Sequence, residues 1–600
     1  MTTATLDTPL AGAYVHPVRD HADADEFLDW LRCPRRVLAV DTETTGLNYF
    51  DEVRLVQVGD ASDAWVLDPS RHDWLIEQAL LGSRRLVAHN APFDLCHLAR
   101  VIGSSAAEHL ELVEDLGRKT FDTALLSHLL DPRDRSQGGI GHALKDLARH
   151  YVDSAAPDGQ EVLKDRFREL GLTMSTGWAE IDRWDPDYVR YAGLDAIITT
   201  RLFDAILPKV LARGHEDLVE FEHQVQRATT AMTVRGMAVD RHYADQLALE
   251  LDEERRGAEA EAATYGVDNV NSTAQVAEAL TARGITLTEV TPSGQAKVDR
   301  AVLEALDDPL AQAVLEAKTA SKALTSWVTP ILDAANRDGR CHPRIRTLAA
   351  RTGRMSISGP PLQQLPARDH RVRSCLIAEP GEVLISVDFS QVELRVLAAL
   401  SCDPRLMGAF DAGLDIHSAT AATIFGPEFT AAHRQVAKAV AFGIVYGGGA
   451  ATLARQAGVD RLVAEEAILK FNRAYPKVRS WSKGLTSSLA WGSEPFLKTP
   501  TGRRIPVDTG TEYRSVNYII QSTARDVFAG ALLQLRAAGL DHYVRLPVHD
   551  EVVCSVPAPW AEEIGAEIAL VMSGTLGGVP IVADFEVCGA RWGDKYAPKD

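Results

Sequence analysis

The sequence predicts a protein of several domains that combines α/β with α+β architecture. Its 600 residues exceed what one hydrophobic core normally organises. Short β-like runs alternate with helical segments from about residue 35 to 205, which is typical of an α/β domain. Helical patterning dominates residues 215–335, where Leu218–Tyr265 and Leu310–Asn336 predict long helices. Strands and helices mix again from about residue 340.

The composition is that of an ordinary globular chain, with 46% hydrophobic and 24% charged residues. No stretch approaches the roughly 18 uncharged apolar residues of a membrane span, and the N-terminus lacks the pattern of a signal peptide. We therefore expect a soluble cytoplasmic protein with no membrane partner. The seven cysteines are scattered and form no C-x-x-C pair, which argues against a disulfide framework and against structural zinc.

The net charge of −20 argues against nucleic-acid binding when it is taken as a total, because phosphate contacts need Lys and Arg. A basic cleft on an acidic body would remove this conflict. One segment suits such a cleft because it concentrates arginines: Arg337, Arg340, Arg344, Arg346, Arg351, Arg354, Arg368, Arg371 and Arg373. Taken alone, such a segment is more often a solvated surface, so its meaning depends on the neighbouring motifs.

Acidic residues follow an apolar strand near the start of the α/β region. Val37–Val40 leads into Asp41 and Glu43, which would project to one side because they are two residues apart in a strand. A second apolar run, Leu86–Ala88, is followed by Asp94. Like charges held together are costly unless cations lie between them, which favours a metal site.

Two further side chains complete this first set. Tyr191 and Asp195 are four residues apart and so share one face of a helix. The four carboxylates suit two Mg²⁺ or Mn²⁺ ions, which prefer oxygen ligands and assist phosphodiester cleavage. Tyr191 would hold or orient the attacking water. Asp122 repeats the Phe-Asp pair of Phe93–Asp94, but the residues after it open a helix, so we interpret Asp122 as a cap.

A second acidic set lies in the C-terminal region. A strand that starts at Val383 ends at Asp388, and Val544–Val548 with Val552–Val556 predicts a hairpin whose turn holds His549–Glu551. Acids at a strand end and at a hairpin tip converge on one metal pair, which is the arrangement for in-line phosphoryl transfer.

A helix between these two acidic segments carries cations on one face. Arg434, Lys438 and Phe442 are spaced four residues apart, so each lies about 40° around the helix from the last. Thr430 is in position to cap this helix. Two cations followed by an aromatic ring suit a triphosphate tail followed by a sugar and a base.

The first set resembles the DEDD-type 3′–5′ exonucleases, in the subclass found in proofreading polymerases. The matching motifs are Asp41-Thr-Glu43, Asn90-Ala-Pro-Phe-Asp94 and Tyr191-Ala-Gly-Leu-Asp195. The second set resembles the family A (polymerase I type) DNA polymerases. The matching segments there are Thr352–Ser356, Pro361–Pro366, Asp388–Arg395, Asp415–His417, the set Arg434, Lys438, Phe442, Tyr446 and Gly447, then Gln521–Ala524, Val548–Glu551 and Arg591–Asp594.

The resemblance implies an RNase H-like 3′–5′ exonuclease domain followed by a right-hand polymerase domain. We expect an N-terminal arm over residues 1–30, the exonuclease over 31–210 and the polymerase over 211–600. Within the polymerase we expect the thumb at about 215–335, the palm at 336–405 and 535–600, and the fingers at 406–530. Two Mg²⁺ or Mn²⁺ ions would serve each site. The partners would be primer–template DNA, dNTPs and, at the exonuclease site, a single-stranded 3′ end.

The resemblance also implies roles for individual residues. The proposed metal ligands are Asp41, Glu43, Asp94 and Asp195 for removal and Asp388 and Asp550 for addition, with Glu551 beside the latter pair. Arg434 and Lys438 would bind the incoming phosphates, and Lys438 would act as general acid toward pyrophosphate. The remaining contacts to dNTP and primer–template would come from Phe442, Tyr446, Glu393, Gln391, His417, Arg354, Gln521 and His549. Phe442 in place of tyrosine would disfavour dideoxynucleotides.

Two positions carry an open question. Ser390-Gln-Val-Glu393 fits a capping box, whereas the resemblance makes Glu393 the residue that blocks a ribose 2′-OH, and we favour the selective role. The family usually places an arginine four residues before Asn517. Tyr513 occupies that position here, so the contribution of the neighbouring Arg514 stays open.

Other functions are considered on the same residues. A single-subunit RNA polymerase shares the palm, but Glu393, Phe442 and the editing motifs argue against it. A nuclease or scaffold with an inactive palm is disfavoured because the expected carboxylates are present. A non-catalytic nucleic-acid-binding protein is disfavoured by the acidity and the two acid clusters. The exonuclease strand begins near residue 37, which leaves no room for an upstream 5′ nuclease and favours a bacteriophage replicative enzyme.

Overall fold

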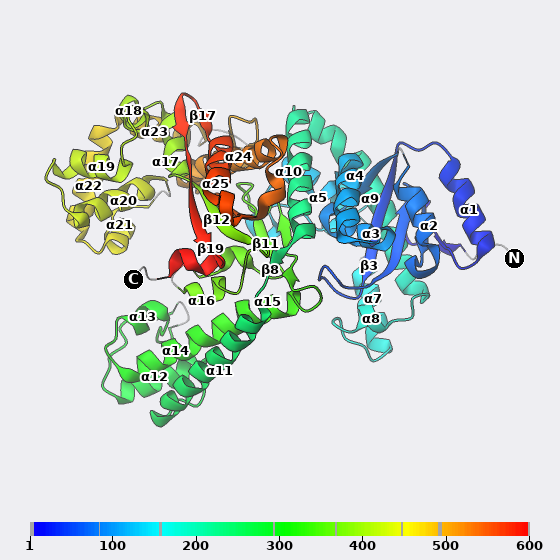
Figure 1. The fold of residues 1–600 in the computed structure, drawn as a ribbon, viewed down its shortest axis with the longest axis horizontal. Coiled ribbons are helices and arrows are strands. Elements are labelled where there is room, and N and C mark those ends of the chain that lie inside the picture. Colours follow the sequence, from blue (N-terminus) through cyan, green and yellow to red (C-terminus); the bar gives the residue numbers. More distant parts are fainter. Residues whose placement is uncertain are drawn as a thin grey trace.

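The structure, a computed structural model, describes residues 5–82, 84–154, 159–291, 294–366, 369–445, 448–489 and 495–597. Figure 1 shows a sheet domain at the N-terminal end, a central body on a second sheet, and two helical projections at the far side of that body. The expected multidomain α/β and α+β architecture is confirmed.

The N-terminal domain is built on a seven-stranded mixed sheet. Its strand order is β1-β2-β5-β4-β3-β6-β7, in which β3 pairs antiparallel with β4 and parallel with β6. The strands are β1 (Leu6–Asp7), β2 (Tyr14–Pro17), β3 (Val37–Thr44), β4 (Val53–Gly59), β5 (Asp63–Leu67), β6 (Arg85–Ala88) and β7 (Thr120–Asp122). The described part of residues 1–30, expected as a separate arm, belongs to this domain because β2 pairs with β5.

Helices cover both faces of this sheet. They are α1 (His21–Arg32), α2 (Pro69–Leu80), α3 (Ala91–Ile102), α4 (Ala106–Lys119), α5 (Thr123–Leu130), α6 (Leu144–Tyr151), α7 (Gly159–Glu169), α8 (Gly177–Glu180) and α9 (Pro186–Leu211). Alternate residues of β3 enter two different cores: Val37 and Ala39 pack on the α9 side, and Leu38 and Val40 on the α2 and α3 side. A strand buried on both faces explains the continuous apolar run in the sequence.

The helical pattern over Leu218–Tyr265 belongs to two helices rather than one. These are α10 (Glu216–Arg235) and α11 (Arg241–Thr264). Gly236 separates them with a φ of 66°, a left-handed conformation that glycine adopts without the steric penalty of a Cβ. Helix α10 packs against α4 of the N-terminal domain and against α24 (Ser515–Ala537) of the central body, so it joins the two.

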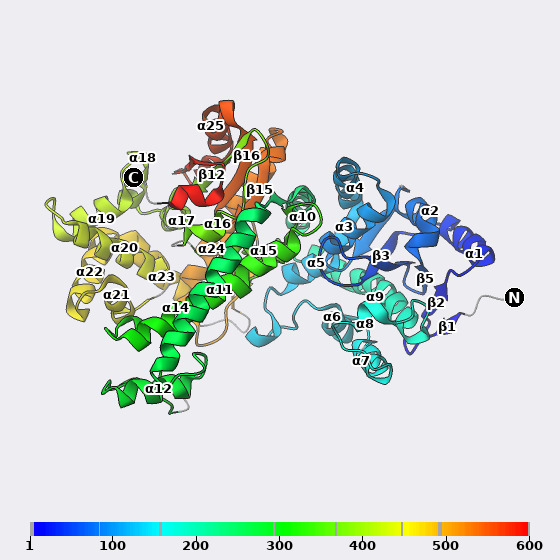
Figure 2. The same cartoon turned by 60° about the horizontal axis from the view of Figure 1, so that its bottom comes forward.

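Helix α11 begins a projecting arm. The other helices of the arm are α12 (Thr273–Ala282), α13 (Arg300–Glu304), α14 (Pro309–Ala323) and α15 (Thr329–Ala334). A π turn at Leu324–Val328 links α14 to α15, so the expected helix over Leu310–Asn336 is present with one irregular turn. Figure 2 shows α11 and α14 lying side by side along the arm.

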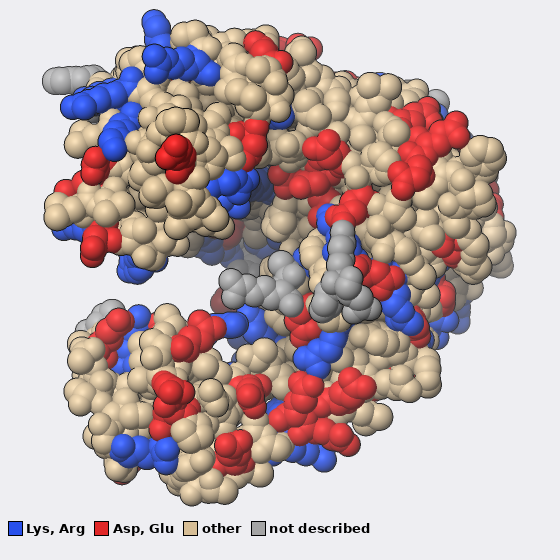
Figure 3. All heavy atoms as spheres, turned by 60° about the vertical axis from the view of Figure 1, so that its left-hand side comes forward, with Lys and Arg blue, Asp and Glu red and all other residues tan. Residues whose placement is uncertain are grey.

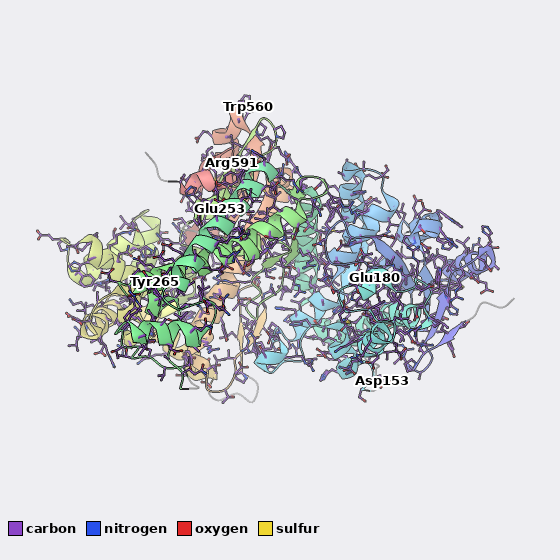
Figure 4. All side chains as sticks on the ribbon, turned by 90° about the horizontal axis from the view of Figure 1, so that it is seen from below. Asp153, Glu180, Glu253, Tyr265, Trp560 and Arg591 are labelled. Atoms are coloured by element: carbon purple, nitrogen blue, oxygen red, sulfur yellow. The ribbon has the colours of Figure 1, made fainter. Side chains whose placement is uncertain are left out.

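The base of the arm is tied to the C-terminal segment. In Figure 4, Arg591 of the C-terminal segment lies near the base of α11, and Glu253 and then Tyr265 follow toward the far end of that helix. The Arg591 guanidinium pairs with Asp240, the cap of α11, and lies 4.6 Å from the centroid of the Tyr243 ring. Arg591, in the C-terminal motif, therefore has a structural role in placing the arm.

The central body is built on a four-stranded antiparallel sheet of order β15-β16-β12-β19. The strands are β12 (Glu382–Phe389), β15 (Val544–Val548), β16 (Glu551–Pro557) and β19 (Ala583–Gly589). Helices α17 (Val392–Ser401), α24 and α25 (Ala561–Met572) contribute to the same hydrophobic core as the sheet. The expected strand at Val383 and the expected hairpin are both present.

A helical lobe forms the second projection. It consists of α18 (Pro404–Asp411), α19 (Ile416–Phe425), α20 (Ala431–Val445), α21 (Ala450–Ala457), α22 (Arg461–Ala474) and α23 (Pro476–Leu489). Figure 3 shows an open cleft between the lobe and the arm, with Lys and Arg along part of its inner wall and many Asp and Glu on the outer faces. This distribution agrees with a basic cleft on an acidic body.

Candidate active sites

The first acidic set converges on one end of β3. Asp41 and Glu43 continue the alternation of that strand on the side that faces α9, which carries Asp195, while Asp94 projects from α3. Glu43, Asp94 and Asp195 are buried. Burial raises the pKa of Asp41 to about 7 against the opposing charge of Lys145. Burial and the charge of Asp41 raise the pKa of both Glu43 and Asp94 above their usual range.

Protein partners hold two of these carboxylates. The Thr42 hydroxyl donates to Asp94 Oδ1 over 2.7 Å, and the Lys145 ammonium forms an ion pair with Asp195. Within the described ranges, no three Asp, Glu, His or Cys side chains already converge in a ligating arrangement. The four carboxylates nevertheless fit hard divalent cations: three of them are buried, three have raised pKa values, and cations relieve the repulsion that burial intensifies.

Helix α9 lies close to the sheet where it carries the third motif. Tyr191 and Asp195 lie one turn apart on it, as expected. A Cβ added to Gly193 would meet the Val15 side chain of β2 at 2.5 Å, so glycine permits this close packing. The Tyr191 ring also lies 4.9 Å from Lys145 Nζ. Tyr191, Lys145 and Asp195 thus form one group above β3.

Asp122 is more than the helix cap inferred from the sequence. It does cap α5 by accepting from the Ala124 N–H, which confirms that interpretation. Its carboxylate also accepts from the N–H groups of Asn90 and Ala91, both at 2.9 Å, where Asn90 has a left-handed φ of 67°. Gln226 Nε2 of α10 donates to the same carboxylate over 2.6 Å. Asp122 therefore fixes the start of α3 and connects it to α10.

Asp122→Ala should reduce exonuclease activity at least about tenfold, because each buried N–H left without an acceptor costs roughly 1–3 kcal/mol and α3 carries Asp94. Primer extension should change little. The measurement is degradation of a single-stranded oligonucleotide beside extension of a matched primer. Asp115→Ala, on the exposed face of α4, is the control. Equal losses of both activities would mean a general loss of stability instead.

The second acidic set lies where β12 meets the β15–β16 hairpin. Asp388 is paired in register with Glu551, and Asp550 lies in the turn beside His549, whose φ is 59°. Burial and then the charges of Asp550 and Glu551 raise the pKa of Asp388 to about 7. The pKa of Asp550 is raised mainly by burial. These carboxylates therefore form a second cluster that favours cations, and the structure brings them together as expected.

Glu551 is held from behind by two residues that the sequence did not single out. Lys595 Nζ lies 3.5 Å from Glu551 Oε1 and donates to Ser386 Oγ over 2.7 Å. The Ser386 hydroxyl in turn donates to Glu551. Glu551 is thus anchored at the rear of the cluster. Asp388 lies near the end of β12, where its surroundings are largely protein although its side chain remains open to solvent.

A cavity of about 290 Å³ lies next to the hairpin turn. The expected site residues that line it are Arg354, Glu393, Gln521, His549 and Asp550. The Arg354 guanidinium forms an ion pair with Glu393.

The capping box at Ser390–Glu393, the less favoured of the two interpretations of Glu393, is not formed. The residue that precedes α17 is Gln391, which has a left-handed φ of 56° and makes no side-chain cap hydrogen bond. The helix therefore starts one residue later than a capping box at Ser390 requires. Gln391 Oε1 is buried without a hydrogen-bond partner among the described residues.

The cationic face of α20 forms a separate group on the lobe. Arg434 Nε donates to Asp415 Oδ2 over 2.8 Å. Burial opposes ionisation of Asp415, but hydrogen bonds from Arg434 and Ser418 hold its pKa below the usual range. The His417 and Phe442 rings lie 5.9 Å apart, and Lys438 is exposed. The Thr430 hydroxyl accepts from the His433 N–H, as expected of a cap. Tyr446 lies outside the described residues.

Part of the arginine-rich segment lies beside the start of α3, the helix that carries Asp94. Arg344 and Arg346 lie on β10 (Arg344–Arg346) and line a cavity of about 240 Å³ together with Asn90 and Phe93. The Arg344 guanidinium also donates to the backbone carbonyl of Leu47 over 2.8 Å. Arg514, at the start of α24, donates to the hydroxyl of the exposed Tyr513 over 3.2 Å.

Both halves of the chain match known families. Residues 241–594 match the model of DNA polymerase family A, and residues 15–211 match a 3′–5′ exonuclease model. The chain belongs to the family A DNA polymerases and carries a 3′–5′ exonuclease domain. It is therefore an enzyme of template-directed DNA synthesis, and the RNA polymerase and non-catalytic alternatives are excluded.

Similar proteins come from mycobacteriophages and bacteria. The DNA polymerase of Mycobacterium phage D29 is 38% identical over 599 residues, and that of phage L5 is 38% identical over 593, with 97% of both chains covered in each case. Among solved structures, the POL domain of Pol1 from M. smegmatis, in complex with DNA primer-template and dNTP, has a TM-score of 0.75 at 23% identity. That match covers 96% of this chain and 99% of the other. Among the described helices, none is long and apolar enough to cross a membrane.

Proposed function

We propose that this enzyme replicates DNA by extending a primer at the β12 and β15–β16 site and removes misincorporated nucleotides at the β3 site. One observation carries the proposal: each of two separate sheets presents its own cluster of carboxylates at a strand end, with pKa values raised by burial and by one another. The second sheet fits a palm, the arm from α11 to α15 fits a thumb within the expected range of about 215–335, and the lobe fits the fingers over about 406–530. Helix α10 packs outside the arm.

Divalent ions complete each site in this proposal. Asp388 and Asp550 would hold two Mg²⁺ or Mn²⁺ ions in the palm. Asp41, Glu43, Asp94 and Asp195 would hold two at the exonuclease site. Such ions supply charge stabilisation for the attacking and leaving oxygens of phosphoryl transfer. The all-oxygen donor set is the one that these ions prefer.

The residues around the palm cluster would place the nucleotide. Lys438 would bind the phosphates and donate a proton to pyrophosphate, and Arg434 would reach them once the triphosphate replaces Asp415 as its partner. His417 and Gln391 would help to position the nucleotide, and Phe442 would lie against the nascent base pair. The cavity beside the hairpin turn would receive the sugar.

The exonuclease site would take a single-stranded 3′ end. Tyr191 would orient the attacking water beside Asp195. The cavity between Asn90 and Arg346 offers apolar and cationic walls at the start of α3, the helix that carries Asp94, which suits a base and a phosphate.

Primer extension with a matched and with a mismatched 3′ end tests both activities together. We expect extension of both primers, with the mismatched nucleotide removed first. Extension of the mismatched primer without removal would exclude editing. Failure to extend either primer in the presence of Mg²⁺ would exclude the palm assignment.

Glu393→Ala should raise ribonucleotide incorporation by at least about tenfold relative to deoxynucleotides, because a short side chain opens space for a 2′-OH in the cavity. The measurement is kcat/KM for a dNTP and for the matching rNTP. Arg354→Ala, which removes the ion-pair partner but leaves Glu393 in place, is the comparison. An unchanged ratio in Glu393→Ala would leave Glu393 with only its ion pair to Arg354.

A further inference from the structure

Lys145 brings a positive charge into the acidic cluster of the exonuclease domain. It lies on α6, which packs against α9, and its ammonium pairs with Asp195. The exposed fractions of the two side chains are 16% and 11%, so the pair is largely shielded from solvent. No motif of the sequence pointed to this lysine.

The charge of Lys145 acts beyond its immediate partner. It lowers the pKa of Asp41 and of Glu43, in opposition to burial, which is the larger influence on both. One ammonium therefore partly neutralises carboxylates on β3 as well as the one on α9. An excess of buried negative charge otherwise destabilises a fold, so this lysine stabilises the site when no other cation is bound.

The ammonium of Lys145 pairs with Asp195, which is one of the proposed ligands of the metal ions. The ion pair occupies Oδ1 of Asp195, so a divalent ion that binds this oxygen has to compete with the ammonium. No ready ligating trio exists within the described ranges. A lysine side chain can move away from Asp195 when a metal ion binds, because its charged group is attached through a flexible chain of four carbons.

We propose that Lys145 is a resident counter-cation of the exonuclease site, which a divalent ion must displace from Asp195 before it binds there. This inference rests on the proposed function of the β3 cluster as a metal-dependent exonuclease. Because the ion has to compete with Lys145, editing needs a higher concentration of divalent ions than the same carboxylates would need without this lysine. In the palm cluster Lys595 also lowers the pKa of Asp388, but it pairs with Glu551, and no described lysine forms an ion pair with Asp388 or Asp550. Editing and synthesis would thus respond differently to the supply of divalent ions.

The test measures binding of Mn²⁺ alone, followed by the electron paramagnetic resonance signal of the free ion. The full chain carries Asp388→Asn and Asp550→Asn throughout, so that the palm contributes no ion. Into this background we place Lys145→Met, which keeps the length of the side chain and removes its charge. Lys145→Arg keeps the charge, and Lys164→Met changes an exposed lysine of α7 as the matched control.

Lys145→Met should bind Mn²⁺ at least about tenfold more tightly than the background chain, because a unit charge close to the ion has been removed. Lys145→Arg should not tighten binding, and Lys164→Met should match the background. Equal or weaker binding in Lys145→Met would overturn the proposal. Mn²⁺ binding that does not depend on Asp41 and Glu43 would instead mean that the exonuclease assignment itself has failed.

If Lys145→Met folds too poorly for the binding measurement, melting temperatures with and without Mn²⁺ still test the proposal. In EDTA, Lys145→Met and Lys145→Gln should melt below Lys164→Met, since the cluster has lost its only described lysine partner at Asp195. Mn²⁺ should then raise their melting temperatures more than that of the control. A lower melting temperature that Mn²⁺ does not restore would mean that Lys145 only supports the packing of α6 on α9, and the proposal would be rejected.

Discussion

Replacing Asp388 or Asp550 by alanine should reduce primer extension by at least about a thousandfold while single-stranded 3′ ends are still degraded. Asp388 is the penultimate residue of β12 and Asp550 lies in the facing hairpin turn, so each substitution removes one of the carboxylates that converge at this point of the sheet. The exonuclease acids lie on a different sheet with a separate hydrophobic core. Loss of the palm cluster therefore leaves the other site intact.

The measurement is the single-turnover rate of adding one dNTP to a matched primer, beside the degradation rate of the same primer strand without template. Asp584→Ala is a matched control, because Asp584 is also paired in register with Asp388 on β19 but carries no proposed role. Extension that survives in Asp388→Ala would refute the assignment of the palm. A parallel loss of degradation would show that the two sites are not independent.

Metal-free stability gives a second expectation for Asp388. Its pKa is raised from the ordinary value of 3.8 to about 7, so the folded protein binds more protons than the unfolded chain between these pH values. The stability contribution of this group is consequently highest below about pH 4 and falls as pH rises toward 7. In EDTA at pH 8, Asp388→Asn should therefore melt above the unsubstituted protein, and the difference should vanish near pH 4. An equal difference at both pH values would exclude this cause.

Local patterns allowed the main elements of both sites to be predicted. The side chains of Asp41 and Glu43 share a face because a strand alternates, and Tyr191 and Asp195 share one because a helix turns every 3.6 residues. The hairpin around Asp550 follows from two apolar runs with a short polar interval. These relations involve neighbouring residues, so the order of the amino acids contains them directly.

Contacts between distant segments could not be predicted in this way. The bonds from Asp122 to α10 and from Lys145 to Asp195 join residues that the fold brings together across many helices and strands. A lone lysine on an amphipathic helix carries no sign of the acid that it will meet. The capping box at Glu393 had the right residues, but the left-handed conformation of Gln391 moved the start of the helix. Backbone conformation at one residue thus overrode a correct local pattern.

Replacing Asp41 and Glu43 together by alanine should reduce degradation of single-stranded 3′ ends by at least about a thousandfold and leave extension of a matched primer unchanged. Both side chains lie on the α9 side of β3, so their loss removes half of the four-carboxylate cluster. Without them, a mismatched primer should be extended with the mismatch retained. The measurements are single-strand degradation, matched extension and the sequence of the product from a mismatched primer.

A matched control is Asp51→Ala with Glu52→Ala, which removes two acids from the loop between β3 and β4 at a partly exposed position. The control should keep its editing activity, because it leaves the cluster untouched. The double variant also bears on Lys145, whose ammonium would keep Asp195 as a partner but lose the charges on β3 that it helps to balance. Because the repulsion between buried carboxylates is relieved, Asp41→Ala with Glu43→Ala should have a melting temperature in EDTA at least as high as that of the unsubstituted protein. If editing persisted in this stable variant, another group of residues would have to perform it, and the two-site division of the enzyme would be wrong.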